Sequence, residues 1–492
     1  MVTVNRISRL ETYPIGGLSW DDGWAKLKLN CSYLSDWGIE NLAEGLRGVA
    51  ASVVYEPHYV CKDHRNLFSN FYSKKFNVGS PYTSRLHFFS VPIDKIEDLQ
   101  ASPERFRDHY IGYSVIRPVK ERCLGRTVID PLKLQNIDKR TFYCLRTTFE
   151  THIGGRRFKV DGYPYTSQDG DVTVCAHSAL WGVCRYLSER YSTYRETYPF
   201  DLVKLTETSS GRVYPHRGMT YSDYCTILSE FGTYPIILRL KEHAGDARVN
   251  AAEFNNLCTY IESGFPLLAS YAGHVVTIIG HTIDYDLVQP GFHNFIDSSS
   301  FLKQFVVVDD NFFPYQRLGH RGDPQNYGKR YRKRKYDISS IVTAVCPLPE
   351  KVFLLADKAR ERTLEYCKGY SKMLSATGKP PFVTRLFLTT NPSFKRRKLE
   401  AASGGPQFDF LSSFVAQFNL PHFIWVMEVS PLNLYKRGFC TTEIVMDATC
   451  GVLEDASIFM RIGDTLIIDG KQNTVSGNPK HFPQYTHNLG ER

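Results

Sequence analysis

Residues 174–187, Val-Cys-Ala-His-Ser-Ala-Leu-Trp-Gly-Val-Cys-Arg-Tyr-Leu, carry apolar side chains at the three-and-four spacing of one helical face. This spacing predicts a helix from Cys175 to about Arg190 that is buried along that face. The preceding segment, residues 165–174, is polar and turn-like. Cys175 is therefore expected at the N-terminal end of a helix, where a thiol more readily forms its reactive thiolate.

Helices and then strands are predicted downstream of this stretch. Thr220 can cap a helix that ends at Gly232, and Asn250 can begin another that ends at Gly264. Four short β-branched runs, each bounded by Gly, Asp or Pro, then have the character of antiparallel strands. These runs are residues 266–271, 274–279, 304–309 and 341–345.

Two of the predicted strands carry residue types that can activate a thiol. His274 follows Gly273 at the start of one strand, and Asp309 and Asp310 stand at the end of another. A cysteine becomes a nucleophile when an imidazole takes its proton, and a carboxylate can orient that imidazole. Together with Cys175, these residues predict a catalytic triad.

The order of these residues resembles that of papain-like cysteine peptidases, in which a helix-borne Cys precedes a strand-borne His and a strand-end Asp or Asn. The local sequences that carry the resemblance are residues 174–187, 273–281 (Gly-His-Val-Val-Thr-Ile-Ile-Gly-His) and 306–311 (Val-Val-Val-Asp-Asp-Asn). They are similar to the branch that contains bacteriocin-leader peptidases and related bacterial enzymes. The resemblance implies a papain-like core and acyl transfer through a thioester.

By this resemblance, Cys175 attacks a carbonyl and His274 takes and returns the proton. Asp309 or Asp310 would hold the imidazole, with Asp309 slightly favoured.

The resemblance also implies an oxyanion donor, a Gln six positions before the Cys. Here Gln168 lies seven positions before Cys175, and Asp169 lies six before it. An ionised Asp cannot donate a hydrogen bond. Either the loop carries one extra residue and Gln168 still reaches the oxyanion, or a different group is the donor.

A second histidine, His281, lies in the same predicted strand as His274. Their odd separation of seven positions places the two side chains on opposite faces of a regular strand. Only one of them can then face Cys175. We favour His274, because Gly273 permits close approach of the backbone and because its position matches the family.

Metal and cofactor motifs are weak. His58, Cys61 and His64 are metal-ligating residue types, but no second pair at a zinc-like spacing stands nearby, so a surface loop is favoured. Gly378-Lys379 lacks the remaining residues of a phosphate-binding loop. The sequence predicts neither a metal nor a cofactor.

The whole chain has the composition of a globular protein. It has 492 residues, of which 42% are hydrophobic and 23% charged, which excludes disordered and fibrous classes. Mixed helix and strand signals predict the α+β fold class in three regions. These are an N-terminal α+β region at 1–150, the papain-like core at 151–349 and a C-terminal α+β region at 350–492.

The net charge of +9 is concentrated in two basic runs. Residues 329–335 hold six basic side chains and residues 395–398 hold four, while the remaining charges nearly balance. We interpret both runs as exposed loops; the functional alternative is an acidic partner, nucleic acid or a localisation signal. The candidate binding residues of the first run are Lys329, Arg330, Arg332, Lys333, Arg334 and Lys335.

Several features predict a cytoplasmic protein without membrane association. No apolar run approaches the roughly 18 residues of a membrane span, and the first residues lack a secretory apolar stretch. The twelve Cys form no CxxC pair, which fits reduced thiols. The sequence does not define the oligomeric state.

Three functions remain open at this point. The leading hypothesis is a thiol peptidase or isopeptidase that cleaves a protein or peptide through a Cys-His-Asp triad. A transglutaminase-like acyltransferase or deamidase would use the same groups with another acceptor. The third is a catalytically inactive papain-like module whose basic loops bind nucleic acid or an acidic protein.

Overall fold

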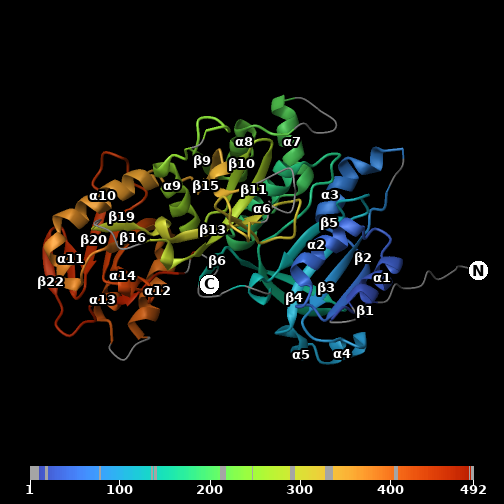
Figure 1. Ribbon diagram of the computed structural model, residues 1–492, viewed down its shortest axis with the longest axis horizontal. Coiled ribbons are helices and arrows are strands. Elements are labelled where there is room, and N and C mark those ends of the chain that lie inside the picture. The colour runs from blue at the N-terminus through green and yellow to red at the C-terminus, as the bar shows by residue number, and fades with distance from the viewer. Residues whose placement is uncertain are drawn as a thin grey trace, which may run out of the picture. The chain divides into compact units, whose positions relative to one another are not determined.

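A computed structural model of the chain belongs to the mixed α+β class, as the sequence predicts (Figure 1). The structure describes residues 10–16, 20–76, 79–134, 137, 141–210, 218–246, 248–288, 294–326, 336–403, 408–486 and 488. The chain forms two compact units. The first comprises residues 1–232, 268–278 and 306–317, and the second comprises residues 233–267, 279–305 and 318–492.

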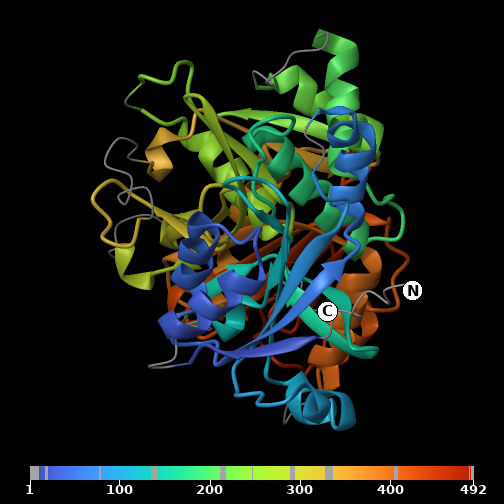
Figure 2. The same cartoon turned by 90° about the vertical axis from the view of Figure 1, so that its right-hand side faces the viewer.

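The first unit begins with an antiparallel sheet in the order β1-β2-β3-β4-β5, whose blue strands lie side by side in Figure 2. Its strands are β1 (Glu11–Pro14), β2 (Ser52–Tyr59), β3 (Thr83–Phe89), β4 (Tyr110–Ile116) and β5 (Leu124–Ile129). The hairpin of β7 (Thr147–Ile153) and β8 (Arg156–Gly162) buries alternate residues, as a strand with one core-facing side does. Phe149 and Phe158 of this hairpin join Phe89 and Tyr110 in one core cluster.

The early helices of the first unit alternate with strands β1 to β4 along the chain, and the later helices follow the hairpin. Early helices are α1 (Trp20–Asn30), α2 (Asp36–Leu46), α3 (Lys62–Asn70), α4 (Ile96–Ala101) and α5 (Glu104–Arg107). Later helices are α6 (Cys175–Arg190), α7 (Pro199–Ser210) and α8 (Tyr221–Phe231). The predicted α8 ends are confirmed: Thr220 caps its start and Gly232 ends it in the left-handed region.

The candidate site lies where strand β11 begins and strand β13 ends, and both points belong to the first unit. The relevant sheet follows the order β13-β11-β10, with β6 (Phe142–Cys144) paired to β11. The three strands are β10 (Leu267–Tyr271), β11 (His274–Ile283) and β13 (Leu302–Val308). The first unit contains the N-terminal half of β11 and the C-terminal end of β13. This arrangement brings His274 and the residues after Val308 to one end of the sheet.

The second unit contains a seven-stranded sheet in the order β12-β16-β17-β19-β20-β21-β22, in which β12 and β16 are parallel and the other pairs are antiparallel. The strands are β12 (Phe295–Asp297), β16 (Phe382–Thr390), β17 (Phe423–Pro431), β19 (Thr442–Asp447), β20 (Ser457–Ile462), β21 (Thr465–Ile468) and β22 (Lys471–Thr474). The strands β9 (Thr233–Arg239) and β15 (Thr343–Pro349) pair with each other, as do β18 (Phe439–Cys440) and β23 (Phe482–Pro483). The helices are α9 (Ala251–Glu262), α10 (Ala356–Gly369), α11 (Ser371–Thr377), α12 (Asn391–Ser403), α13 (Phe410–Val415) and α14 (Leu432–Tyr435).

The second basic run differs from its prediction. Residues 395–398 lie in helix α12, not in an exposed loop. Lys398 is buried and forms an ion pair with the buried Glu443 of β19. The helix forms because its buried face, with Phe394 and Ala402, packs on the unit's core. The first basic run, residues 329–335, lies outside the described residues.

None of the helices in the described part of the chain combines the length and the apolar character needed to cross a membrane.

Candidate active site

Helix α6 places Cys175 at its first residue. The preceding Val174 has extended backbone angles, and its N–H donates to Nδ1 of His177 at 3.3 Å. The first backbone N–H groups of a helix have no acceptor within the helix, so those of Cys175 and Ala176 point out of the helix end. Of the twelve free cysteines, only Cys175 and Cys225 are not buried.

His274 begins strand β11 directly after a tight turn. Gly273 in that turn has a φ of 79°, which favours glycine, while a Cβ there would meet nothing within 4 Å. No described residue makes the close approach that Gly273 is expected to permit, and the glycine serves the backbone turn. The turn still fixes the position of the His274 ring at the end of the sheet.

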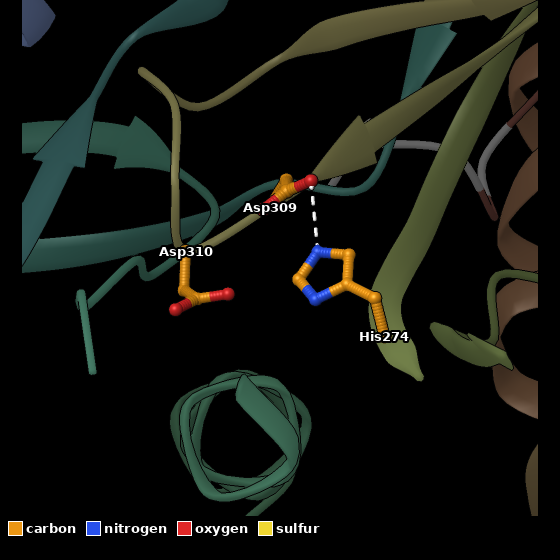
Figure 3. Close-up of side chains that lie close together, drawn as sticks. All are labelled: His274, Asp309 and Asp310. Carbon is orange, nitrogen blue, oxygen red and sulfur yellow. Dashed lines mark ion pairs between the residues drawn. The ribbon is translucent and has the colours of Figure 1, made fainter. Parts of the chain in front are cut away.

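Asp309 is the carboxylate that holds His274. Its Oδ2 lies 3.0 Å from Nε2 of the ring, and both side chains are buried (Figure 3). Strand β13 ends at Val308, so Asp309 is the first residue beyond the strand. In Figure 3 the second ring nitrogen, Nδ1, faces away from Asp309 and toward a helix seen end-on in the colour of α6.

The electrostatics of this pair favour an imidazolium. Burial alone would lower the pKa of His274, but the charge and hydrogen bond of Asp309, with a hydrogen bond to the Cys175 thiol, raise it to about 11. Burial would raise the pKa of Asp309, but the His274 charge and two hydrogen bonds from Asn311 lower it. The thiol and the carboxylate thus both favour the charged form of the same ring.

Asn311 is a site residue that the sequence analysis did not assign. Its backbone N–H and its side-chain Nδ2 both donate to Oδ1 of Asp309 at 2.9 Å. The same Nδ2 lies 3.4 Å from Nε2 of His274 and 3.4 Å from Oδ1 of Asp310. Asn311 therefore orients the carboxylate that holds the ring. Its place directly after the two acidic residues was the available signal.

Asp310 is buried, contrary to the expectation that the second carboxylate faces solvent or caps a turn. Only 5% of the residue is exposed, and burial together with the Asp309 charge raises its pKa to about 7. Asp310 lines a small cavity with Cys175. Other residues of the cavity wall are Tyr163, Pro164, Thr166, Ser178, Ala179, Gly182, Val275, Thr277 and Val308.

The loop before α6 is fixed by Asp169. One oxygen of Asp169 accepts the backbone N–H groups of Asp171, Val172 and Thr173 at 2.8–2.9 Å. This carboxylate organises its own loop. Gln168 contributes its backbone N–H to the Asp310 carboxyl, and its side chain is not among the described residues that line the Cys175 cavity.

The side chains at this place are also potential metal ligands. Within the described ranges, His274, Asp309 and Asp310 are the one group of three such residues whose ligand atoms lie within 4.8 Å of one another. A cation bound there would take the Asp309 oxygen that pairs with His274. Because that oxygen and the ring already form a 3.0 Å ion pair, we assign His274 and Asp309 to that ion pair and not to a metal ion.

The other candidate residues have partners elsewhere. His281 forms an ion pair with Glu262 in the second unit. Nε2 of His64 lies 2.9 Å from the carbonyl oxygen of Ser80, and the Cys61 sulfur donates weakly to Asp63 at 3.9 Å. None of these contacts involves Cys175.

No protein-family model matches the chain, and the curated proteins include no similar sequence.

Proposed function

We propose that this protein is a cysteine peptidase or isopeptidase that cleaves a protein or peptide through a thioester on Cys175. The observation that carries the proposal is the His274 ring, whose Nε2 pairs with Asp309 and whose pKa the Cys175 thiol also raises. An imidazolium beside a thiol at a helix N-terminus stabilises the thiolate that attacks a carbonyl. The fold around the site is, on this proposal, a papain-like core in a cytoplasmic enzyme.

The proposed reaction has two halves, acylation of Cys175 and then hydrolysis of the thioester, and each catalytic group acts once in each half. The Cys175 sulfur bonds to the carbonyl carbon, and the electron pair of the C=O bond moves to the oxygen. The tetrahedral species then collapses, and the leaving amine takes a proton from His274. In the second half, water attacks the thioester while His274 accepts its proton, and the proton returns to the departing sulfur. Asp309 keeps the ring oriented throughout.

Alkylation by iodoacetamide tests whether the thiol is activated. The protein contains a matched internal control, because Cys225 is the other cysteine that is not buried. We expect Cys175 to react faster than Cys225, as measured by mass spectrometry of the two peptides. His274→Ala should slow the reaction at Cys175 and leave Cys225 unchanged. Equal rates at the two cysteines in the wild-type protein would contradict the proposal.

Peptide cleavage tests the reaction class. Incubation with a peptide library should give products that are lost with Cys175→Ala. Incorporation of a labelled amine into a glutamine-containing protein, without cleavage, would instead identify the acyltransferase alternative, which uses the same thioester.

A further inference from the structure

Asp310 is a buried carboxyl group beside Cys175 that the proposed triad does not use. Its Oδ2 has no hydrogen-bond partner among the described residues. A buried polar atom without a partner is costly, so native proteins rarely leave one without a reason. Because Asp310 and Cys175 line the same cavity, a group that enters this cavity to react with the sulfur can supply the missing partner.

Neighbouring groups fix the orientation of Asp310. The Tyr165 hydroxyl donates to its backbone carbonyl at 3.1 Å, and Nδ2 of Asn311 donates to its Oδ1 at 3.4 Å. The Gln168 backbone N–H also donates to the carboxyl group. Three hydrogen bonds therefore hold Asp310 in place, and Oδ2 is the carboxyl oxygen that has no hydrogen-bond partner among the described residues.

The expected side-chain donors to an oxyanion do not serve this cavity. The wall formed by the described residues includes Thr166 but not Gln168. Asp169 is occupied by three backbone N–H groups of its own loop. The backbone N–H of Cys175, at the open end of α6, is one available donor. A further donor aimed at the same oxygen would add to this stabilisation, since removing one donor typically slows acyl transfer about 10²-fold or more.

We propose that Asp310, in its neutral carboxylic-acid form, donates a hydrogen bond to the oxyanion that forms when Cys175 attacks a carbonyl. This inference rests on the proposed function. The proton stays on Asp310 during the attack, so the group acts as a donor and not as an acid that transfers its proton. The oxyanion collapses with expulsion of the leaving group, whose proton comes from His274.

The surroundings of Asp310 favour the neutral form. Burial and the adjacent Asp309 carboxylate raise its pKa to about 7, while the charges of His274 and Arg122 act in the opposite direction. Cys175 and Asp310 line the same cavity. The donor is consequently present below neutral pH and is lost as the pH rises through about 7.

Two reagents separate oxyanion stabilisation from thiol activation. Acylation of Cys175 by p-nitrophenyl acetate forms an oxyanion, whereas alkylation by iodoacetamide does not. Asp310→Ala should slow acylation about 10²-fold and leave alkylation within about twofold. Asp310→Asn keeps an N–H donor of similar size, so it should retain most of the acylation rate. The acylation to alkylation ratio should fall above pH 7 in the wild-type protein but not in Asp310→Asn.

The outcomes distinguish the two proposals. Equal loss of acylation in Asp310→Asn and Asp310→Ala would show that the anion is required, and full retention in both would show that the side chain is not a donor; either result overturns this inference. Failure of the proposed function itself would appear earlier, as a Cys175 that iodoacetamide alkylates no faster than Cys225 in the wild-type protein.

Discussion

One carboxylate sets the charge of the His274 ring. Burial favours the neutral imidazole, and the Asp309 charge overcomes it and raises the pKa of the ring to about 11. We therefore predict that the ring is protonated at pH 8 in the wild-type protein and neutral at pH 8 in Asp309→Asn. Nitrogen-15 NMR of the histidine rings measures this directly, with His274→Gln used to assign the signal. An unchanged ring signal in Asp309→Asn would contradict the electrostatic account.

The sequence identified the residue types of the site but not the roles of the two acidic residues. Alternation along a strand predicts opposite faces for Asp309 and Asp310, yet the strand ends at Val308 and both carboxyl groups are buried. Beyond a strand end the backbone turns, so the period of two no longer determines where a side chain points. The side-chain contacts of Asn311 depend on that same turn, which explains why its role was missed.

At the level of elements, α12 shows that a basic run can contribute to a core. Lys398 is 7% exposed and pairs with Glu443, which is 1% exposed. Removal of one partner from a buried ion pair leaves an uncompensated charge and typically costs about 3–5 kcal/mol. We predict that Lys398→Ala lowers the free energy of unfolding by that amount, as measured by urea denaturation.

Arg396, two residues earlier on the same helix, is the matched control because it is exposed. Arg396→Ala should change the free energy of unfolding by no more than about 0.5 kcal/mol. Similar effects of the two substitutions would show that the Lys398–Glu443 pair does not hold α12 in place.

Helices with strong local sequence signals were predicted correctly. Helices that depend on packing against distant residues were missed. The helix at Cys175–Arg190 and the α8 caps follow from nearby residues, and the structure has both. Helix α12 was missed because four consecutive basic residues resemble a solvated loop. The partner that makes Lys398 compatible with a helix is Glu443, which lies 45 positions away.

At the scale of the molecule, the compact units are assembled from segments that are distant in the chain. The first unit takes residues 268–278 and 306–317 from within stretches that otherwise belong to the second. Those two short segments carry His274, Asp309 and Asp310. The sequence predicts three consecutive regions, because the order of residues along the chain does not show which strands pair to complete a compact unit. The site depends on these inserted segments.

Buried histidines of the first unit make its stability sensitive to acid. Burial lowers the pKa of both His64 and His87 to about 4. A base whose pKa is depressed on folding contributes stability that is present above its unfolded value of about 6.5 and is lost as the pH falls toward 4. Each ring can thus reduce the free energy of unfolding by up to about 1.4 kcal/mol per pH unit over this window.

His87→Gln isolates one of these contributions. Nδ1 of His87 lies 2.9 Å from the Tyr110 hydroxyl, and a glutamine can hydrogen-bond there without titrating. Other titrating groups, Asp310 included, are common to both proteins and cancel in the comparison. Between pH 6.5 and 4.5, the variant should therefore lose less stability per pH unit than the wild type, by up to about 1.4 kcal/mol. Urea titrations followed by tryptophan fluorescence measure mainly the first unit, which holds four of the five Trp. The exposed His58→Gln is the control; if its pH slope matched that of His87→Gln, burial of the His87 ring would not be the cause.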